Sequence, residues 1–272
     1  MANIAKKMLA TSFTYNSVRV EIPAYLSSTL GAEQVQKFPP FVRWFERLQA
    51  SLASTASGGV GKYYQLKNIE IQSADFFAKG TKLGFLKIKA LVEDDTGSSL
   101  PGIVLLRGQS VAILVLVYPS LDPAANNPAD YDDIIITIQP RIAGADMAMA
   151  EIPAGMYDPE DNRLSFAAQR ELKEECGIEV VADDMRPLLS AAADRAGGIF
   201  PSAGALDEQL QFFYCRKLMH ARDIEELEGR AGGAEDEREK ITLKVVPLSD
   251  LITATLDAKA IIAAALYNNL AK

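Results

Sequence analysis

The sequence predicts a mixed α/β protein, with a smaller β-rich N-terminal domain (residues 1–100) followed by a larger domain built on a mixed sheet (residues 101–272). Two observations locate the larger domain. Gly108–Tyr118 and Ile134–Gln139 are β-branched, apolar segments long enough for strands buried on both faces. Ser165–Cys176 carries apolar residues at helical spacing, so strands and helix together indicate an α/β fold.

The first hundred residues combine predicted strands with one predicted helix. Ser17–Ile22 and Ile69–Ala74 have strand character, while Phe41–Leu52 is amphipathic and begins after Pro39-Pro40. Phe41 and Trp44 share one face of this helix, where we expect core or dimer contacts. Two turn-rich stretches follow, a loop and then the expected domain boundary: Ser51–Gly61 and Asp94–Gly102.

The second domain contains further recognisable elements. For the helix at Ser165–Cys176, Ser165 is the candidate N-cap and Gly177 the stop. Proline, asparagine and aspartate indicate a loop at Asp122–Asp133. Two more strands and an alanine-rich closing helix are predicted at Leu210–Cys215, Ile241–Val246 and Asp257–Leu270.

Composition limits the partners of the protein. Of its 272 residues, 49% are apolar and 24% charged, as in ordinary globular proteins. The formal net charge of −8 opposes binding to nucleic acid, whose phosphates are held by lysine and arginine. A small phosphate substrate is compatible with this charge if a divalent cation supplies positive charge locally. No apolar run approaches the ~20 residues of a membrane-spanning helix, so we expect no membrane partner.

Cysteine and histidine usage points to a reducing compartment and away from histidine chemistry. Cys176 and Cys215 have neither disulfide-framework nor metal-site spacing, which favours the cytoplasm. Met1–Thr14 is basic and lacks acids but contains no arginine, which leaves organellar import open. His220 is the single histidine, and we expect it to be structural or exposed.

Three carboxylates are clustered on the predicted helix. Residues three and four apart share a helix face, so Glu171, Glu174 and Glu175 lie together, about 110° from the stripe of Ala168, Leu172 and Cys176 that can pack on the sheet. Crowded carboxylates repel one another unless a cation neutralises them, and Mg²⁺ prefers such hard oxygen ligands, with Mn²⁺ as a substitute. A solvated helix face is the alternative for an isolated acidic triplet.

The flanking residues resemble a known family motif, the Nudix box, G-x5-E-x7-R-E-U-x-E-E-x-G-U with U a bulky aliphatic residue. The run R-E-L-K-E-E-C-G-I, from Arg170 to Ile178, matches it, with Gly155 as the opening glycine. The stretch between them is one residue longer than the pattern, and Asp161 or Asn162 stands where the pattern has its intermediate glutamate. The resemblance implies a Nudix α/β/α sandwich.

Four segments are similar to one branch, the ADP-sugar diphosphatases: Arg107–Val117, Gln139–Arg141, Glu151–Met156 and Pro201–Gly204. This similarity implies Mg²⁺-dependent hydrolysis of a nucleoside diphosphate sugar, ADP-ribose or ADP-glucose, to AMP and a sugar phosphate. It also implies a homodimer to which the N-terminal domain contributes.

The resemblance assigns metal ligands residue by residue. Glu171 and Glu175 would bind the metal together with the carbonyl of Ala154, while Arg170 would orient the acids and Glu174 would be a ligand or a close catalytic partner. Glu151, just before the Pro-Ala-Gly turn, would face the substrate end of the site. An exposed acid at a strand end is the alternative for Glu151.

An acidic, glycine-containing loop, Gly229–Lys240, precedes the last predicted strand. In similar enzymes a mobile loop at this place carries glutamates that close on the metal and the attacking water. The resemblance therefore implies Glu237 as general base and Glu239 as metal ligand, with Glu235 as the fallback. A solvated loop without a role is the alternative.

Substrate contacts are expected from two other places. Arg141 follows a predicted strand and a proline, where its guanidinium can fork onto diphosphate oxygens. The turn containing Ser202 and Gly204 would shape the sugar or phosphate pocket, and Glu208 just beyond it is the second candidate for the base. Two alternative functions stay open: hydrolysis of another nucleoside diphosphate derivative, and a catalytically inactive Nudix domain that senses nucleotides.

Overall fold

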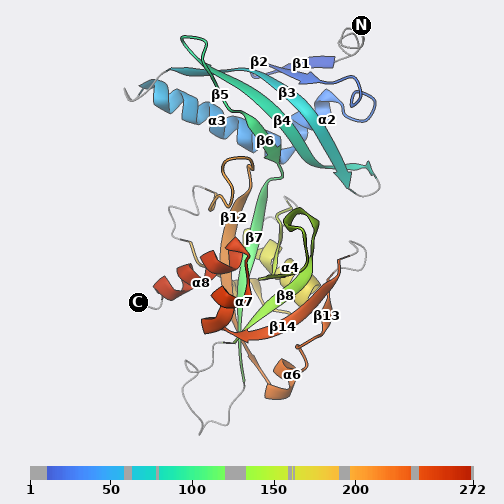
Figure 1. The fold of residues 1–272 in the computed structure, drawn as a ribbon, viewed down its shortest axis with the longest axis vertical. Helices are drawn as coiled ribbons and strands as arrows, with labels where there is room; N and C mark the ends of the chain where they lie inside the picture. Colours follow the sequence, from blue (N-terminus) through green and yellow to red (C-terminus); the bar gives the residue numbers. More distant parts are fainter. Residues whose placement is uncertain are drawn as a thin grey trace. The chain divides into compact units, whose positions relative to one another are not determined.

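The computed structural model describes residues 11–57, 63–77, 80–119, 133–158, 161, 163–189, 197–233 and 239–270. The chain forms two compact units, Met1–Gly108 with Ser202–Glu208, and Gln109–Pro201 with Gln209–Lys272 (Figure 1). The first unit thus extends beyond residue 100, where the sequence placed the boundary. The reason is that the turn-rich stretch Asp94–Gly102 lies inside the first sheet and connects strands of that sheet.

The first unit contains a mixed sheet in the order β1-β2-β3-β4-β5, with β6 also pairing with β4. β2 and β3 are parallel, and the other pairs are antiparallel. Its strands are β1 (Thr11–Tyr15), β2 (Val18–Ile22), β3 (Tyr64–Phe77), β4 (Lys82–Asp94), β5 (Ser99–Leu100) and β6 (Ile103–Leu106). The predicted strands correspond to β2 and β3, whereas β4 had no counterpart among the sequence predictions.

Two helices, α2 (Ala32–Lys37) and α3 (Pro39–Ser57), pack on one face of this sheet (Figure 1). The longer helix begins at the predicted proline pair and continues to Ser57, beyond the predicted start of the loop. Phe41 is fully buried and Trp44 partly buried in the core that the helices share with the strands. This unit therefore has a hydrophobic core of its own.

The second unit contains a mixed sheet in the order β11-β12-β7-β8-β14-β13. β7 and β12 are parallel, whereas the neighbouring pairs are antiparallel. Its strands are β7 (Gln109–Pro119), β8 (Asp133–Arg141), β9 (Asp146–Glu151), β10 (Ala154–Met156), β11 (Arg186–Pro187), β12 (Gln209–Met219), β13 (Ala231–Gly232) and β14 (Ile241–Pro247). All four strands predicted in this part of the chain are present.

Helices cover both faces of the second sheet, which confirms the α/β/α sandwich. One core lies between the sheet and α4, and the other between the sheet and α7 and α8 (Figure 1). The thiols Cys176 and Cys215 are buried in the α4 core. The helices and short helical turns of this unit are α4 (Leu164–Cys176), α6 (Ala221–Glu225), α7 (Leu251–Ala254), α8 (Ala258–Leu270), η3 (Ile142–Gly144), η5 (Ala182–Asp184) and η6 (Leu248–Asp250).

The two central strands of this sheet pair only at one end. β7 and β8 are joined at Leu116–Ile134 and Val117–Asp133, and beyond this point β10 pairs with β7 while β9 pairs with β8. The short β9–β10 connection, Ile152-Pro153, thus lies where the sheet divides. Polar side chains can enter the sheet at this place.

Some local predictions were wrong or fall outside the described residues. Ser165 is not the N-cap of α4, because the helix starts at Leu164 and its N-cap is Arg163, whose side chain makes no capping hydrogen bond. The predicted loop Asp122–Asp133 lies outside the described residues except for Asp133. His220 is exposed and precedes α6. In the described part of the chain, no helix is both long and apolar enough to cross a membrane.

Candidate active site

Helix α4 carries the acidic cluster and ends at a glycine. Gly177 adopts the left-handed conformation, with φ of 60°, and its N–H donates to the carbonyl of Lys173, which ends the helix as the sequence predicted. Glu171 and Glu175 are buried, whereas Glu174 is exposed. The acids that share a helix face therefore differ strongly in their environment.

Arg170 holds several acids around the start of this cluster. Its guanidinium lies 2.9 Å from Glu171, 3.0 Å from Glu174 and 3.2 Å from Asp161, and it also donates to the carbonyl of Met156. Burial disfavours the charged guanidinium, but these ion pairs outweigh burial and raise the pKa of Arg170. Asp161 is thus part of the cluster, while Asn162, the other residue considered at this place, lies outside the described residues.

Glu171 packs against the backbone of Gly155. A Cβ atom on residue 155 would lie 1.8 Å from the carboxyl carbon of Glu171, so a larger residue fits here only if the Glu171 carboxyl group or the strand moves. Burial, and to a smaller extent the nearby carboxylates of Glu174 and Glu239, raise the pKa of Glu171 to about 7 against the lowering effect of Arg170. The opening glycine of the motif therefore lets the carboxyl group of Glu171 lie directly against the backbone of residue 155.

Glu175 is anchored to the neighbouring strand β10. One of its carboxylate oxygens accepts a hydrogen bond of 3.1 Å from the N–H of Ala154. Burial and the charge of Glu171 raise the pKa of Glu175 well above its usual value, although the bond from Ala154 lowers it. The structure thus places the backbone N–H of Ala154 next to Glu175.

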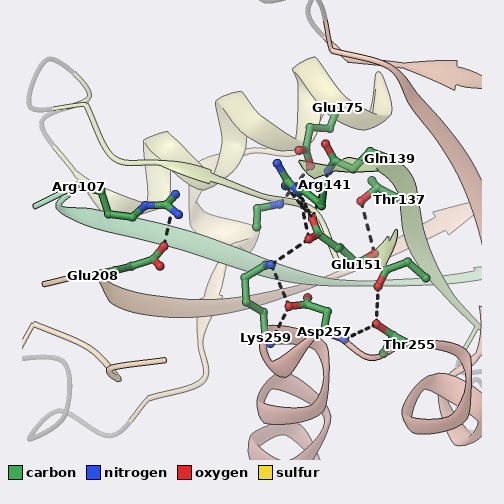
Figure 2. A network of polar contacts seen from close by, with 12 residues as sticks. Arg107, Thr137, Gln139, Arg141, Glu151, Glu175, Glu208, Thr255, Asp257 and Lys259 are labelled. Carbon is green, nitrogen blue, oxygen red and sulfur yellow. Dashed lines mark hydrogen bonds and ion pairs between the residues drawn. The ribbon is translucent and has the colours of Figure 1, made fainter. Parts of the chain in front are cut away.

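Arg141 and Glu151 form a second polar cluster at the division of the sheet (Figure 2). Nε of Arg141 donates to both Glu151 oxygens at 3.0 Å, and Nη2 donates to one of them at 2.7 Å. Gln139 adds a weaker contact of 3.3 Å. Glu151 is buried while Arg141 is 41% exposed, so the glutamate holds the arginine, and the arginine has an accessible side.

The loop before β14 is close to α4 through two glycines. A Cβ atom on Gly232 would lie 1.9 Å from the carbonyl oxygen of Glu175, and the N–H of Gly233 donates to the carbonyl of Glu174 at 3.2 Å. A Cβ atom on Gly233 would lie 2.8 Å from Cβ of Glu239. Glu239 is near enough to influence the pKa values of Glu171 and Glu175. Glu235 and Glu237, the two candidates for the general base in this loop, lie outside the described residues.

The remaining predicted residues belong to the first unit. Ser202 begins a turn in which its carbonyl accepts the N–H groups of Ala205 and Leu206, and Gly204 lies within this turn. Glu208 is buried and forms an ion pair of 3.5 Å with Arg107 (Figure 2). The turn and Glu208 therefore make these contacts with residues of their own unit.

Comparison with known proteins decides the family. Nudix hydrolase 14, chloroplastic, from Arabidopsis thaliana is 34% identical over 230 residues, which cover 84% of this chain and 69% of that protein. The chain belongs to the Nudix hydrolase family. No family model matches the chain. A solved structure described as an ADP compounds hydrolase covers 79% of this chain and 96% of its own, with a TM-score of 0.52 and 17% identity, which shows a common fold.

The acids of this Nudix hydrolase suit a divalent cation. Members of the family generally depend on such a metal. Glu171 and Glu175 are oxygen donors with raised pKa values, because both are buried and carboxylates repel one another there. Within the described ranges, however, no three acid, histidine or cysteine side chains come together as a complete metal site. The chemistry of the donors fits a hard cation, with further ligands needed to complete the site.

Sequence reasoning on this Nudix hydrolase missed one contributor, the start of α8. Lys259 lies 3.6 Å from Glu151 and 2.9 Å from Asp257, and Thr255 donates to the carbonyl of Ala150 (Figure 2). The spacing of these residues from the motif gives no signal. The helix sequence itself could have indicated a role for Lys259, because this lysine is the one charged residue in Ala258–Leu270.

Proposed function

We propose that this Nudix hydrolase cleaves the diphosphate bond of a nucleoside diphosphate sugar, ADP-ribose or ADP-glucose, giving AMP and a sugar phosphate. The observation that carries the proposal is the pair of buried carboxylates, Glu171 and Glu175, held by the backbone at Gly155 and Ala154. The solved structure with the common fold is described as a hydrolase of ADP compounds, which supports the choice of nucleotide.

Glu171, Glu175 and Glu239, with the carbonyl of Ala154, would hold Mg²⁺, and Mn²⁺ would substitute for it. When bound, the metal supplies positive charge to the phosphate oxygens and makes a coordinated water more acidic. Arg170 keeps Glu171 and Glu174 in place through its ion pairs, so its role is to orient the acids.

The attacking water needs a group that accepts its proton. We assign this role to Glu237 of the acidic loop, with Glu208 as the second candidate. Glu174, exposed on α4 beside Arg170, is the close partner of the reacting groups. Water is the nucleophile, so no covalent intermediate with the protein is needed.

Substrate binding is assigned to Arg141 and to the Ser202–Gly204 turn. The guanidinium of Arg141 has donors left over from its contacts with Glu151 and carries the positive charge that a diphosphate requires. Glu151 aims this arginine and is thereby part of the substrate end of the site. The turn at Ser202 and Gly204 would bound the sugar or phosphate.

We also propose that the protein is a homodimer, with the N-terminal domain of residues 1–100 as the dimerisation region. The core of the first unit supports a domain with a role of its own. The cytoplasm is the proposed compartment, with import into an organelle open, since the relative from Arabidopsis thaliana is named chloroplastic.

A panel of nucleotides with Mg²⁺ tests the proposed function. We expect kcat/KM for ADP-ribose or ADP-glucose to exceed that for ATP by at least about tenfold, or about 1.4 kcal/mol in transition-state binding. Chromatography would identify AMP and the sugar phosphate as products. Faster cleavage of nucleoside triphosphates or dinucleoside polyphosphates than of every ADP-sugar would contradict the substrate assignment, and a complete lack of turnover would favour a nucleotide sensor.

A further inference from the structure

Lys259 occupies an unusual position at the start of helix α8. It is the one charged residue of a helix otherwise made of apolar, asparagine and tyrosine residues, and its side chain is only 17% exposed. A cation removed from water to this extent is costly unless anions compensate it. Its Nζ lies 2.9 Å from Oδ1 of Asp257 and 3.6 Å from Oε1 of Glu151, which supply that compensation.

The first turn of α8 is tied to the end of strand β9. The Thr255 hydroxyl donates to the carbonyl of Ala150 and accepts the N–H of Asp257 at 2.9 Å. The Asp257 carboxylate in turn accepts the backbone N–H of Lys259 at 3.2 Å. This chain of bonds fixes the base of the lysine next to Ala150, the residue that precedes Glu151.

Glu151 is consequently held by two cations that come from different layers of the sandwich. Arg141 approaches it from strand β8 with three hydrogen bonds, and Lys259 approaches from helix α8 (Figure 2). Because Glu151 is buried and contacted on both sides, its carboxylate has little freedom to rotate. The orientation of Arg141 depends on this carboxylate.

Two acids and two cations of this cluster oppose one another, and Glu175 and Glu239 add further negative charge near Arg141. Glu151 and Asp257 oppose Arg141 and Lys259, so the loss of Lys259 would leave one buried negative charge in excess. That charge would offset more of the positive charge of Arg141, which already contacts Glu151, and would repel a diphosphate nearby. Lys259 is therefore in a position to keep the positive charge of Arg141 available.

We propose that Lys259 is a positioning residue for substrate binding, which fixes and neutralises Glu151 so that Arg141 presents its guanidinium to the diphosphate. The inference rests on the proposed function, since it assumes that Arg141 binds the substrate. It extends the site to the C-terminal helix, which carries none of the motif residues.

Steady-state kinetics of the full chain with ADP-ribose and Mg²⁺ test this role. In Lys259→Met we expect KM to rise by about tenfold while kcat stays within about threefold. Substrate binding is weakened in this variant, whereas the acids of helix α4 are unchanged. Lys259→Arg, which keeps the charge, should restore KM to within about threefold of wild type. The matched control is Lys244→Met, at an exposed position on β14, which should leave both constants unchanged.

A second substitution separates positioning from general stability. In a Glu151→Gln background, Lys259→Met should change KM by less than about twofold, because the charge that the lysine neutralises is gone. Lys259→Gln replaces the methionine variant if the latter fails to fold. An unchanged KM in a folded Lys259 variant, or an equal increase in both backgrounds, would overturn the inference. Absent turnover of wild type on every ADP-sugar would instead overturn the proposed function, and the inference with it.

Discussion

Glu171 and Glu175 lie one helical turn apart, and both are buried. Two carboxylates taken out of water beside each other destabilise the metal-free protein, since burial and mutual repulsion both disfavour their charged forms. A chain selected for stability alone would not place them there. This cost indicates a function that needs concentrated negative charge.

Replacing one of these acids separates function from folding. We expect Glu175→Gln to fold normally and to lose most metal-dependent turnover, because a ligand charge is removed while the shape of the side chain is kept. Circular dichroism and kcat/KM at saturating Mg²⁺ measure the two effects. Glu179→Gln, at a side chain that is 75% exposed, is the control with unchanged activity. A near-wild-type rate for Glu175→Gln would exclude Glu175 as a ligand.

The contact between Gly155 and Glu171 leads to a second prediction. In Gly155→Ala the new methyl group would overlap the Glu171 carboxyl group, so the acid or the strand must move. A displacement of about 1 Å at a catalytic site can cost about 10²-fold, and we expect kcat/KM to fall by this order.

Gly31→Ala is the matched control for this substitution. The nearest atom to its added Cβ would be 3.7 Å away, an ordinary contact, and activity should be retained. If Gly155→Ala kept wild-type kcat/KM, the tight contact would have no role in the reaction.

At the scale of elements, the sequence predicted what local signals encode. Helical apolar periodicity and a glycine predicted α4 and its stop at Gly177, and apolar runs predicted the strands β7, β8, β12 and β14. Ser165 failed as N-cap because the helix starts one residue earlier, without a side-chain cap.

Features that depend on distant pairing were not predicted. The division of the sheet between β7 and β8 arises from the inserted β9 and β10 strands, and no local pattern specifies that pairing. The contact between Glu151 and Lys259 likewise joins segments that lie far apart in the sequence of the second unit. Sequence reasoning found Arg141 and Glu151 one by one, but not that the glutamate holds the arginine.

The loop before β14 is the element that we expect to supply the general base. If Glu237 accepts the proton of the attacking water, Glu237→Gln should lower kcat by about 10²–10⁴ with a modest change in KM. Glu208→Gln, assayed in parallel, is the comparison. Should only the Glu208 variant show this loss, the base would belong to the segment that includes Glu208, and the loop would have another role.

For the whole molecule, the two units differ in what they contribute. The second unit contains the acids of α4 and the Arg141–Glu151 pair, whereas the first has its own core and also includes residues 202–208 from the later part of the chain. In the sheet of the first unit, β1 is an edge strand that pairs with β2. An edge strand offers backbone groups to which a second copy can bind.

The last prediction concerns this assembly. We expect sedimentation to give twice the 29.5 kDa mass of the chain, with dissociation on dilution. If residues 1–100 form the dimer contact, amide exchange in β1 should be slower at high than at low protein concentration, because pairing protects the edge. Amides of the exposed helix α6 serve as the internal control and should exchange equally at both concentrations. A dimer whose β1 amides exchange at one rate throughout would place the contact elsewhere, and a monomer at all concentrations would mean that one chain forms the complete site.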